Sequence, residues 1–296
     1  MQSFSRGWQF LKQAWQMASA DKDLIKPSIY TLFAGAIVAV IGIIPIVIAV
    51  LLFSNSAFGQ VFLYLGGALL VFGNFIISYI FSAMTVYLIY GYLSEGDGRM
   101  DKAWAIVQRD LWDLATLAAA STAVNALKNL VKGSGKKAGR NFLGNLIQTI
   151  WTEASYLILP AMVIEDINLV DGIKRATQIV QDNLLLVGIS TVGVKTVTGL
   201  IGFGLGLTGA ILGSALGFGI ISLAGGTTVT FGLVAGIVLG LLVFFIFTMI
   251  ATVINAYTST AYHTCLYLWA RDAERAQSAG QSIHIAAPAP LAAVLD

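Results

Sequence analysis

The stretch that decides the fold is GLIGFGLGLTGAILGSALGFG, residues 199–219, where glycine recurs among apolar side chains. It lies within residues 184–270, an 87-residue segment whose one formal charge is Lys195. Soluble cores do not tolerate so long an uncharged run, whereas a bilayer needs about 20 apolar residues to cross about 30 Å of hydrocarbon. The chain is therefore predicted to be an integral membrane protein.

Composition agrees with that prediction. Hydrophobic residues make up 57% of the 296 residues and charged residues 11%, against roughly a quarter charged in a soluble domain. One cysteine, Cys265, excludes an internal disulfide and a multi-cysteine metal cluster. We expect an N-terminal segment over residues 1–27, one transmembrane domain over residues 28–276, and a flexible tail over residues 277–296. The first apolar run, which begins at residue 28, is too long for the apolar part of a signal peptide.

Five apolar runs are long enough to cross a bilayer, and a sixth is weaker. The strong runs are residues 29–53, 61–93, 141–164, 184–224 and 229–269, and the weaker, alanine-rich run is residues 111–131. Most lysines and arginines flank these runs in segments that the positive-inside rule places in the cytoplasm. The sequence therefore predicts a multi-pass protein of a prokaryotic inner membrane, with both termini cytoplasmic.

The two central runs pose a topological problem, because a basic loop joins them. This loop contains Lys128, Lys132, Lys136, Lys137 and Arg140. If both runs cross, the loop lies outside and violates the positive-inside rule, whereas a re-entrant or in-plane hairpin keeps it inside, facing lipid.

One carboxylate in each run, Asp113 and Glu153, also favours incomplete insertion, since a carboxylate at the bilayer centre costs at least about 2.5 kcal/mol. The favoured fold is an all-α bundle of four full spans plus a membrane-associated hairpin. Six full spans is the alternative.

Residues 3–18 form an amphipathic pattern, with Phe4, Trp8, Leu11 and Trp15 at helical spacing. Arg6 and Lys12 fall on the opposite face. Such a helix lies in the membrane interface, so Trp8 and Trp15 are predicted anchors and the cations are expected to meet anionic headgroups. A helix that binds a partner protein is the alternative.

Glycines four residues apart form two series on consecutive runs. The first is Gly209, Gly213 and Gly217, the second is Gly232, Gly236 and Gly240, and a ridge of Gly202, Gly206, Ala210 and Ser214 lies beside the first. Residues four apart share a helix face, and small side chains let two helix backbones approach closely. The two series are expected either to pack on each other or to face a second copy of the chain.

Lys195 is an ionisable side chain deep within a strong run, and it should have a partner. Asp113 and Glu153 are the candidate carboxylates, in a structural pair or in an ion pathway. Asn74, like Asn255 and His263, is expected to form hydrogen bonds between helices. No pattern of nucleophile and base, metal ligands or cofactor motif is present, so no catalytic, metal or cofactor site is predicted and an enzyme is not expected.

Three motifs occur in order: Phe4-Ser5-Arg6-Gly7-Trp8, Asp21-Lys22-Asp23-Leu24, and a tryptophan–proline–acidic–basic signature. The third comprises Trp151, Pro160, Met162 to Glu165 and Gly172 to Thr177. They resemble an uncharacterised family of bacterial and archaeal polytopic membrane proteins, although the glycine-dense half departs from the family pattern. The resemblance implies six spans and no known activity.

These features predict a non-enzymatic membrane protein that self-assembles through its glycine-rich helix faces and acts as a scaffold or membrane organiser. An ion channel or small-solute transporter, using Lys195 with Asp113 or Glu153, is the alternative. The expected partners are the bilayer, anionic headgroups, further copies of the chain and, through the tail, a protein, but no nucleic acid.

Overall fold

The structure is a computed structural model that describes residues 2–53, 56–133, 138–182, 184–223, 231–280 and 287–295. Within these ranges it is helical and contains no strand, which confirms the predicted all-α class. The helices are α1 (Gln2–Ala20), the 3-10 helix η1 (Lys22–Leu24), α2 (Lys26–Phe53), α3 (Ala57–Glu95), α4 (Met100–Arg109), α5 (Leu111–Gly133), α6 (Ala138–Glu165), α7 (Leu169–Asp182), α8 (Leu184–Leu223), α9 (Phe231–Ser278) and α10 (Ala289–Leu295).

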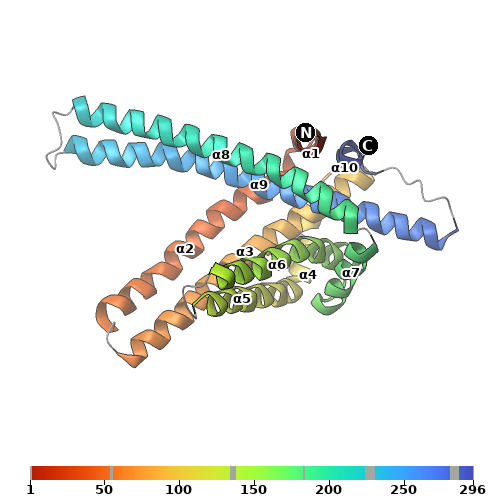
Figure 1. Ribbon diagram of the computed structural model, residues 1–296, viewed down its shortest axis with the longest axis horizontal. Coiled ribbons are helices and arrows are strands. Elements are labelled where there is room, and N and C mark those ends of the chain that lie inside the picture. Colours follow the sequence, from red (N-terminus) through yellow and green to blue (C-terminus); the bar gives the residue numbers. More distant parts are fainter. Residues whose placement is uncertain are drawn as a thin grey trace.

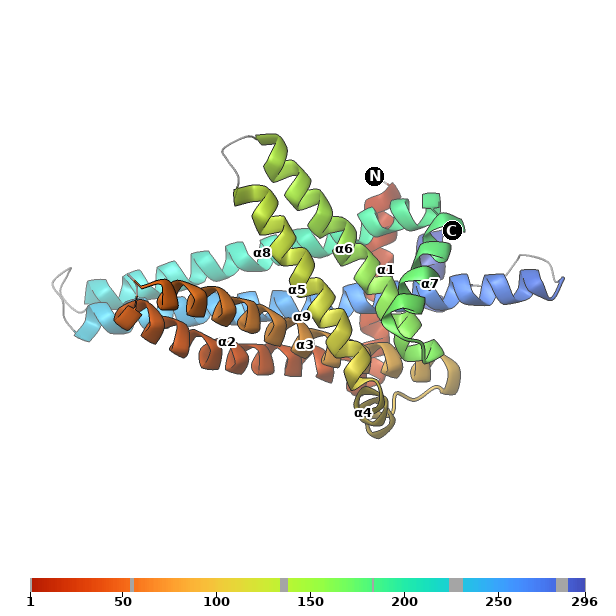
Figure 2. The same cartoon turned by 90° about the horizontal axis from the view of Figure 1, so that it is seen from below.

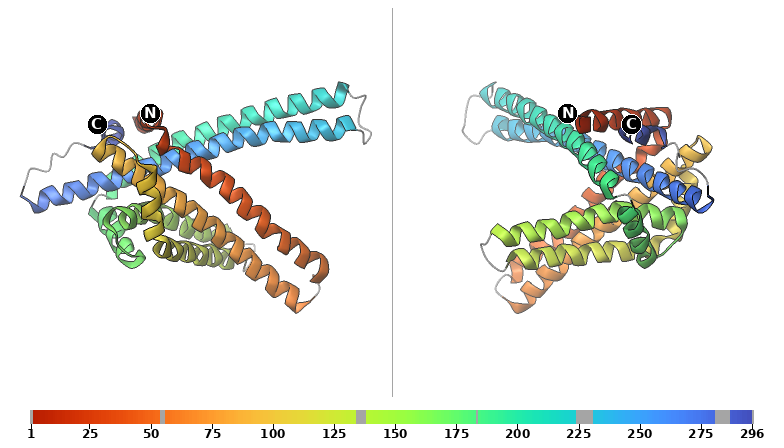
Figure 3. Two further views of the ribbon diagram at one scale, coloured as in Figure 1. Left: turned by 180° about the vertical axis from the view of Figure 1, so that it is seen from behind. Right: turned by 45° about the vertical axis from the view of Figure 1, so that its right-hand side comes forward.

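Three helical hairpins, α2–α3, α5–α6 and α8–α9, point their turns to the same side of the molecule (Figure 1). Both chain ends lie on the opposite side, where the other helices gather (Figures 2 and 3). An arrangement of paired helices returns the chain to its starting side. The two termini are therefore on one side of the protein.

Two of the hairpins extend from the rest of the molecule as arms that diverge from each other (Figure 1). We call residues 29–80 of α2 and α3 the first arm, and residues 199–256 of α8 and α9 the second arm. Large apolar side chains are exposed along both, among them Ile41, Leu51, Tyr64, Phe203, Phe218 and Phe245. Water does not tolerate such surfaces, so both arms belong in the bilayer.

The remaining parts of the long helices pack with α1, α4, α7 and α10 into what we call the base. Its core is tight: Phe10, Leu88, Leu114, Ile158 and Tyr257 are among its fully buried side chains. The helices α8 and α9 have 40 and 48 residues, or about 60 and 72 Å at 1.5 Å per residue. Each therefore forms one of the two helices of the second arm and continues into the base.

Helix α1 is docked on protein, which corrects part of the interfacial prediction. Leu11, expected to face lipid, is buried, and Trp15 donates its Nε1–H to Thr258 Oγ1 at 3.3 Å. A Cβ at Gly7 would overlap the Gly193 carbonyl oxygen of α8, so α1 and α8 cross in close contact. Trp8 remains 50% exposed. An amphipathic pattern identifies an apolar face, but lipid and protein can both cover it.

The turn between α1 and α2 is tied to the turn between α3 and α4. Asp21 accepts the N–H of Asp23 at 2.9 Å through Oδ1 and the N–H of Gly98 at 2.7 Å through Oδ2. A Cβ at Gly98 would lie 2.8 Å from Leu24 Cδ1, so the turns meet without room for a side chain. The aspartate and leucine of the Asp21–Leu24 motif are thus structural.

The predicted tail is partly ordered against its own chain. Helix α9 continues to Ser278, and α10 contacts α1, α8 and α9 with Leu291 fully buried. The sequence of this segment, rich in alanine and proline, contains no helical pattern strong enough to predict that docking.

Among the residues that the structure describes, five helices are long and apolar enough to cross a membrane: α2, α3, α6, α8 and α9. Helix α5, the weaker run of the predicted hairpin, is not among them, although it pairs with α6 as expected. Of the basic loop, Lys136, Lys137 and the side chain of Arg140 lie outside the described residues. Lys132 lies in the last turn of α5, and its stem lies over Gly144 of α6, where a Cβ would be 3.0 Å from Lys132 Cγ.

Candidate functional site

A polar cluster lies where α6, α8 and α9 meet. Glu153 of α6 uses both carboxylate oxygens: Oε1 is paired with Lys195 Nζ of α8, and Oε2 lies 3.6 Å from His263 Nε2 of α9. Three helices distant in sequence therefore share one carboxylate. This cluster is the candidate functional site.

The surrounding base positions the cluster. Trp151, two residues before Glu153 in α6, donates its indole N–H to Ser121 Oγ of α5 at 2.8 Å. The hydroxyl of Ser121 also forms a hydrogen bond with Tyr79 Oη of α3 at 2.7 Å. On α9, Tyr257 donates to the Ala14 carbonyl of α1 at 2.9 Å. These bonds fix the rotation of α6 and α9 and thereby orient Glu153 and His263 toward each other.

Of the two predicted carboxylate partners of Lys195, the structure selects Glu153. Asp113 lies in the first turn of α5, where a negative charge complements the helix dipole. Within the described residues Asp113 forms no ion pair with Lys195. The prediction of Asp113 as a partner is therefore wrong, because Glu153 of α6 is the carboxylate that pairs with Lys195.

Asn74 also differs from its prediction. Its side-chain amide donates to the Leu70 carbonyl of its own helix at 2.9 Å. Its oxygen lies near Gly35 of α2, where an added Cβ would be 3.7 Å away. The residue therefore satisfies its N–H locally and does not join two helices with that bond.

The second candidate surface is the contact between α8 and α9, where glycine faces glycine. A Cβ at Gly217 would lie 2.8 Å from the Gly236 carbonyl oxygen, and one at Gly240 would lie 2.6 Å from that of Gly213. A Cβ at Gly209 would meet Phe247 Cβ at 2.7 Å. The two glycine series thus pack on each other within one chain, with Gly232 half-buried in the first turn of α9.

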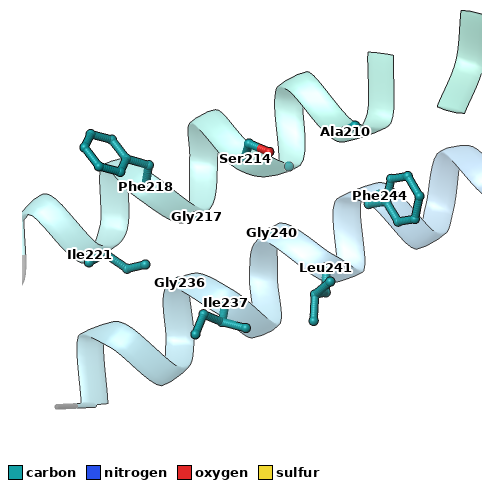
Figure 4. A pocket seen from close by; sticks show the side chains of 11 residues that line it. Ala210, Ser214, Gly217, Phe218, Ile221, Gly236, Ile237, Gly240, Leu241 and Phe244 are labelled. Atoms are coloured by element: carbon teal, nitrogen blue, oxygen red, sulfur yellow. The ribbon is translucent and has the colours of Figure 1, made fainter. Parts of the chain in front are cut away.

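Gly202 and Gly206 do not take part in this contact. A Cβ at either position would meet nothing within 4 Å. Farther along the arm, the contact borders an apolar groove of about 440 Å³ that Ala210 and Ser214 help to line (Figure 4). Gly202, Gly206 and Ala210 are half-buried and Ser214 is exposed, so their own chain covers this ridge only in part; because of the open space beside its two glycines, we call it the uncovered ridge.

Two charged groups missed by the sequence reasoning hold the base together. Arg175 of α7 bonds Glu274 of α9 at 2.5 Å and Glu165 of α6 at 3.3 Å. Burial lowers the pKa of the Arg175 guanidinium, but the bond to Glu274 and the charge of Glu165 outweigh it and hold that pKa above its usual value. Arg109 similarly joins Asp110 at 2.6 Å to Asp166 at 3.1 Å. The sequence signal for these charged groups was the pair Lys174-Arg175, which served only as evidence for a cytoplasmic segment under the positive-inside rule.

His263 is the functional candidate that the sequence undervalued. It was expected to bond a neighbouring helix, whereas its Nδ1 bonds the Ser259 carbonyl of its own helix at 2.7 Å and its Nε2 faces Glu153. In the part of the chain that the structure describes, no three His, Cys, Asp or Glu side chains are grouped as metal ligands. The site is thus a polar cluster of three residues, in which Glu153 and Lys195 form an ion pair and His263 lies beside the carboxylate.

The fold and this cluster define an all-helical, multi-pass membrane protein. No protein-family model matches the chain, and neither a curated protein nor a solved structure matches it. The resemblance to an uncharacterised polytopic family therefore stays a prediction.

Proposed function

We propose that the protein is a non-enzymatic scaffold of the membrane, assembled from copies of the chain that pack through the second arm. The uncovered ridge beginning at Gly202 and Gly206 carries this proposal. Glycine in a helix interior costs about 1 kcal/mol relative to alanine. Two glycines one turn apart, with open space before both, suit the close approach of another helix.

The occupant of the ridge is a helix of a second copy. The first arm and the second arm diverge (Figure 3), so neither covers the other. Both display large apolar side chains. In a bilayer, helix association depends on close packing rather than on apolar burial. The ridge is the part of the second arm that offers such packing without displacing a contact within the chain.

The mass of the particle in nanodiscs tests the scaffold. We expect the wild-type chain to be oligomeric and the double variant Gly202→Leu, Gly206→Leu to be smaller. The matched control is Gly204→Leu, Thr208→Leu, because these two positions are also one turn apart and exposed but lie on the side of α8 away from Gly202 and Gly206. A monodisperse wild-type monomer, or equal loss in both variants, would contradict the proposal.

We further propose a six-span topology in a prokaryotic inner membrane, with both termini, and the end of the base that carries them, on the cytoplasmic side. The exposed side of α5 supports this: Trp112, Leu127 and Leu130 lie on it, and Trp112 to Leu130 covers about 27 Å at 1.5 Å per residue. The carboxylates no longer argue against crossing, since Asp113 lies at the base end of α5 and Glu153 has a cation.

Cysteine labelling at Ser134 tests this topology. The variant Cys265→Ala, Ser134→Cys contains a single thiol, which we expect an impermeant reagent to reach only from outside. Labelling from the cytoplasmic side would restore the four-span prediction and place Lys132, Lys136, Lys137 and Arg140 on anionic headgroups of the inner leaflet. Trp8 remains a proposed lipid anchor under both topologies.

A second function, an ion channel or small-solute transporter, is favoured by the Glu153–Lys195 pair. A charge within a span marks an ion or substrate pathway by default. If the pair conducts, liposomes containing the protein will show ion flux, and Glu153→Gln or Lys195→Met will remove it. If wild-type liposomes show no ion flux while the oligomer is intact, the transport function is wrong and the scaffold remains the one proposed function.

A further inference from the structure

Neither function assigns a role to His263, although its surroundings hold it in one orientation. The ring stacks on Tyr156 of α6, with centroids 4.6 Å apart and planes 12° from parallel. Tyr262 approaches the same ring edge-on at 5.0 Å. Because the ring is held on two sides, each of its nitrogens keeps a fixed neighbour.

The neighbour of Nδ1 determines where the ring carries its hydrogen. Nδ1 lies 2.7 Å from the Ser259 carbonyl oxygen, one turn earlier in α9. A carbonyl oxygen only accepts hydrogen bonds, so Nδ1 is the protonated nitrogen. In the neutral ring, Nε2 therefore has a lone pair and no hydrogen, and this is the nitrogen that faces α6.

Nε2 and Glu153 Oε2 face each other at 3.6 Å. When neither atom carries a proton, a nitrogen lone pair and a carboxylate oxygen oppose each other without a hydrogen between them. One proton on either atom converts this into an attractive contact, N–H to O or O–H to N. Lys195 occupies Oε1, so the carboxylate is held in place on its other side.

We propose that Glu153 and His263 form a proton-binding site, in which one proton is held between Oε2 and Nε2 while Lys195 holds Oε1. A proton that enters on the carboxylate can move to Nε2, leaving a carboxylate and an imidazolium. Entry raises the charge of the site by one, and the transfer leaves it unchanged. Side-chain exposure rises from 4% at His263 to 28% at Glu153 and 44% at Lys195, so the proton enters past Glu153.

The groups that face the pair predict how it responds to charge changes. They are Glu153 and Tyr156 of α6, Lys195 of α8, and Ser259 and Tyr262 of α9, with Tyr79 of α3 near Tyr156. The Lys195 cation opposes a proton on His263, whereas the Glu153 anion favours it. Protonated His263 and Lys195 also compete for the carboxylate of Glu153. Acid therefore strengthens the contact between α6 and α9 and weakens the one between α6 and α8.

Two histidines in the chain make the test direct. The variant His284→Gln leaves His263 as the sole histidine, and ¹⁵N-histidine NMR of the full chain in nanodiscs reports which ring nitrogen carries hydrogen. We expect the Nδ1–H form at neutral pH and a proton on Nε2 in acid. At a fixed pH on the titration curve, Lys195→Met should raise, and Glu153→Gln lower, the ratio of protonated to neutral ring by about tenfold.

The matched control is Lys174→Met, which removes an exposed lysine paired with Asp171 on α7. It should leave the His263 spectrum unchanged. An Nε2–H form at neutral pH would overturn the proposal. This outcome is measured with the wild-type side chains at the site, so it does not depend on how stable the variants are. A titration that neither site substitution moves, or one that Lys174→Met moves equally, would overturn it as well. None of these outcomes bears on assembly or ion flux.

Discussion

The two arms use glycine in opposite ways. In the second arm glycine meets glycine, and the backbones of α8 and α9 touch at Gly213 and Gly240. In the first arm, glycine meets a large side chain: an added Cβ at Gly42 would be 2.9 Å from Leu70 Cδ1, and one at Gly73 would be 3.0 Å from Val38 Cγ1. Backbone cannot move aside, whereas a leucine can change rotamer. The glycines of the second arm are therefore expected to tolerate a side chain less well than those of the first arm.

The largest expected effect follows from the backbone contact. The double variant Gly213→Ala, Gly217→Ala places two methyl groups against the Gly240 and Gly236 carbonyls. We expect the free energy of unfolding to fall by about 3 kcal/mol or more, beyond the gain in helix propensity, because overpacking against backbone leaves no relaxed rotamer. Unfolding in mixed micelles measures it. A stabilised variant would mean that the two helices do not touch there.

The first arm should yield a smaller and reversible effect. Gly42→Ala is expected to cost about 1 kcal/mol, because Leu70 must shift by a few tenths of an ångström. In a Leu70→Ala background the same substitution should be neutral or stabilising, so the double-mutant cycle gives a coupling energy of about 1 kcal/mol. A cycle without coupling would remove the proposed difference between the arms.

A still smaller effect, of opposite sign, is expected at the uncovered ridge. Gly202→Ala should stabilise the dissociated protein by up to about 1 kcal/mol, since the methyl group meets open space and alanine is the better helix former. The measurement is unfolding in detergent at concentrations where the protein is monomeric. A destabilised monomer would show that the ridge has a partner within its own chain.

The sequence predicted the long apolar helices, because charge exclusion and length are strong signals of segments that suit a bilayer. It also predicted the glycine faces and the need of Lys195 for a partner. It could not choose between Asp113 and Glu153, because the choice depends on how α5 and α6 are rotated against α8. It misjudged α1 since Leu11 and Trp15 show the same periodicity whether lipid or the rest of the protein covers them. His263 was undervalued because a single histidine has no characteristic spacing to a second functional residue.

The smallest expected effect concerns pH and separates both arms from the base. Residues 29–80 and 199–256 contain no Asp, Glu, Lys, Arg or His, so their packing should not depend on pH between about 3 and 8. In the base, the bond from Lys174 at 2.9 Å and its charge lower the pKa of Asp171, which Asn168 also bonds in the first turn of α7.

Because the folded pKa of Asp171 lies below its unfolded value, the carboxylate contributes stability that is present above about pH 4 and lost as pH falls through the folded value. We expect hydrogen-exchange protection factors in the first turn of α7 to fall in that window, while those of α8 in the second arm stay constant. Asp171→Asn should flatten the α7 profile. Acid-dependent protection in the arm, with α7 unchanged, would reverse the assignment, because it would require a titratable group to support packing that the structure builds from glycine and apolar side chains.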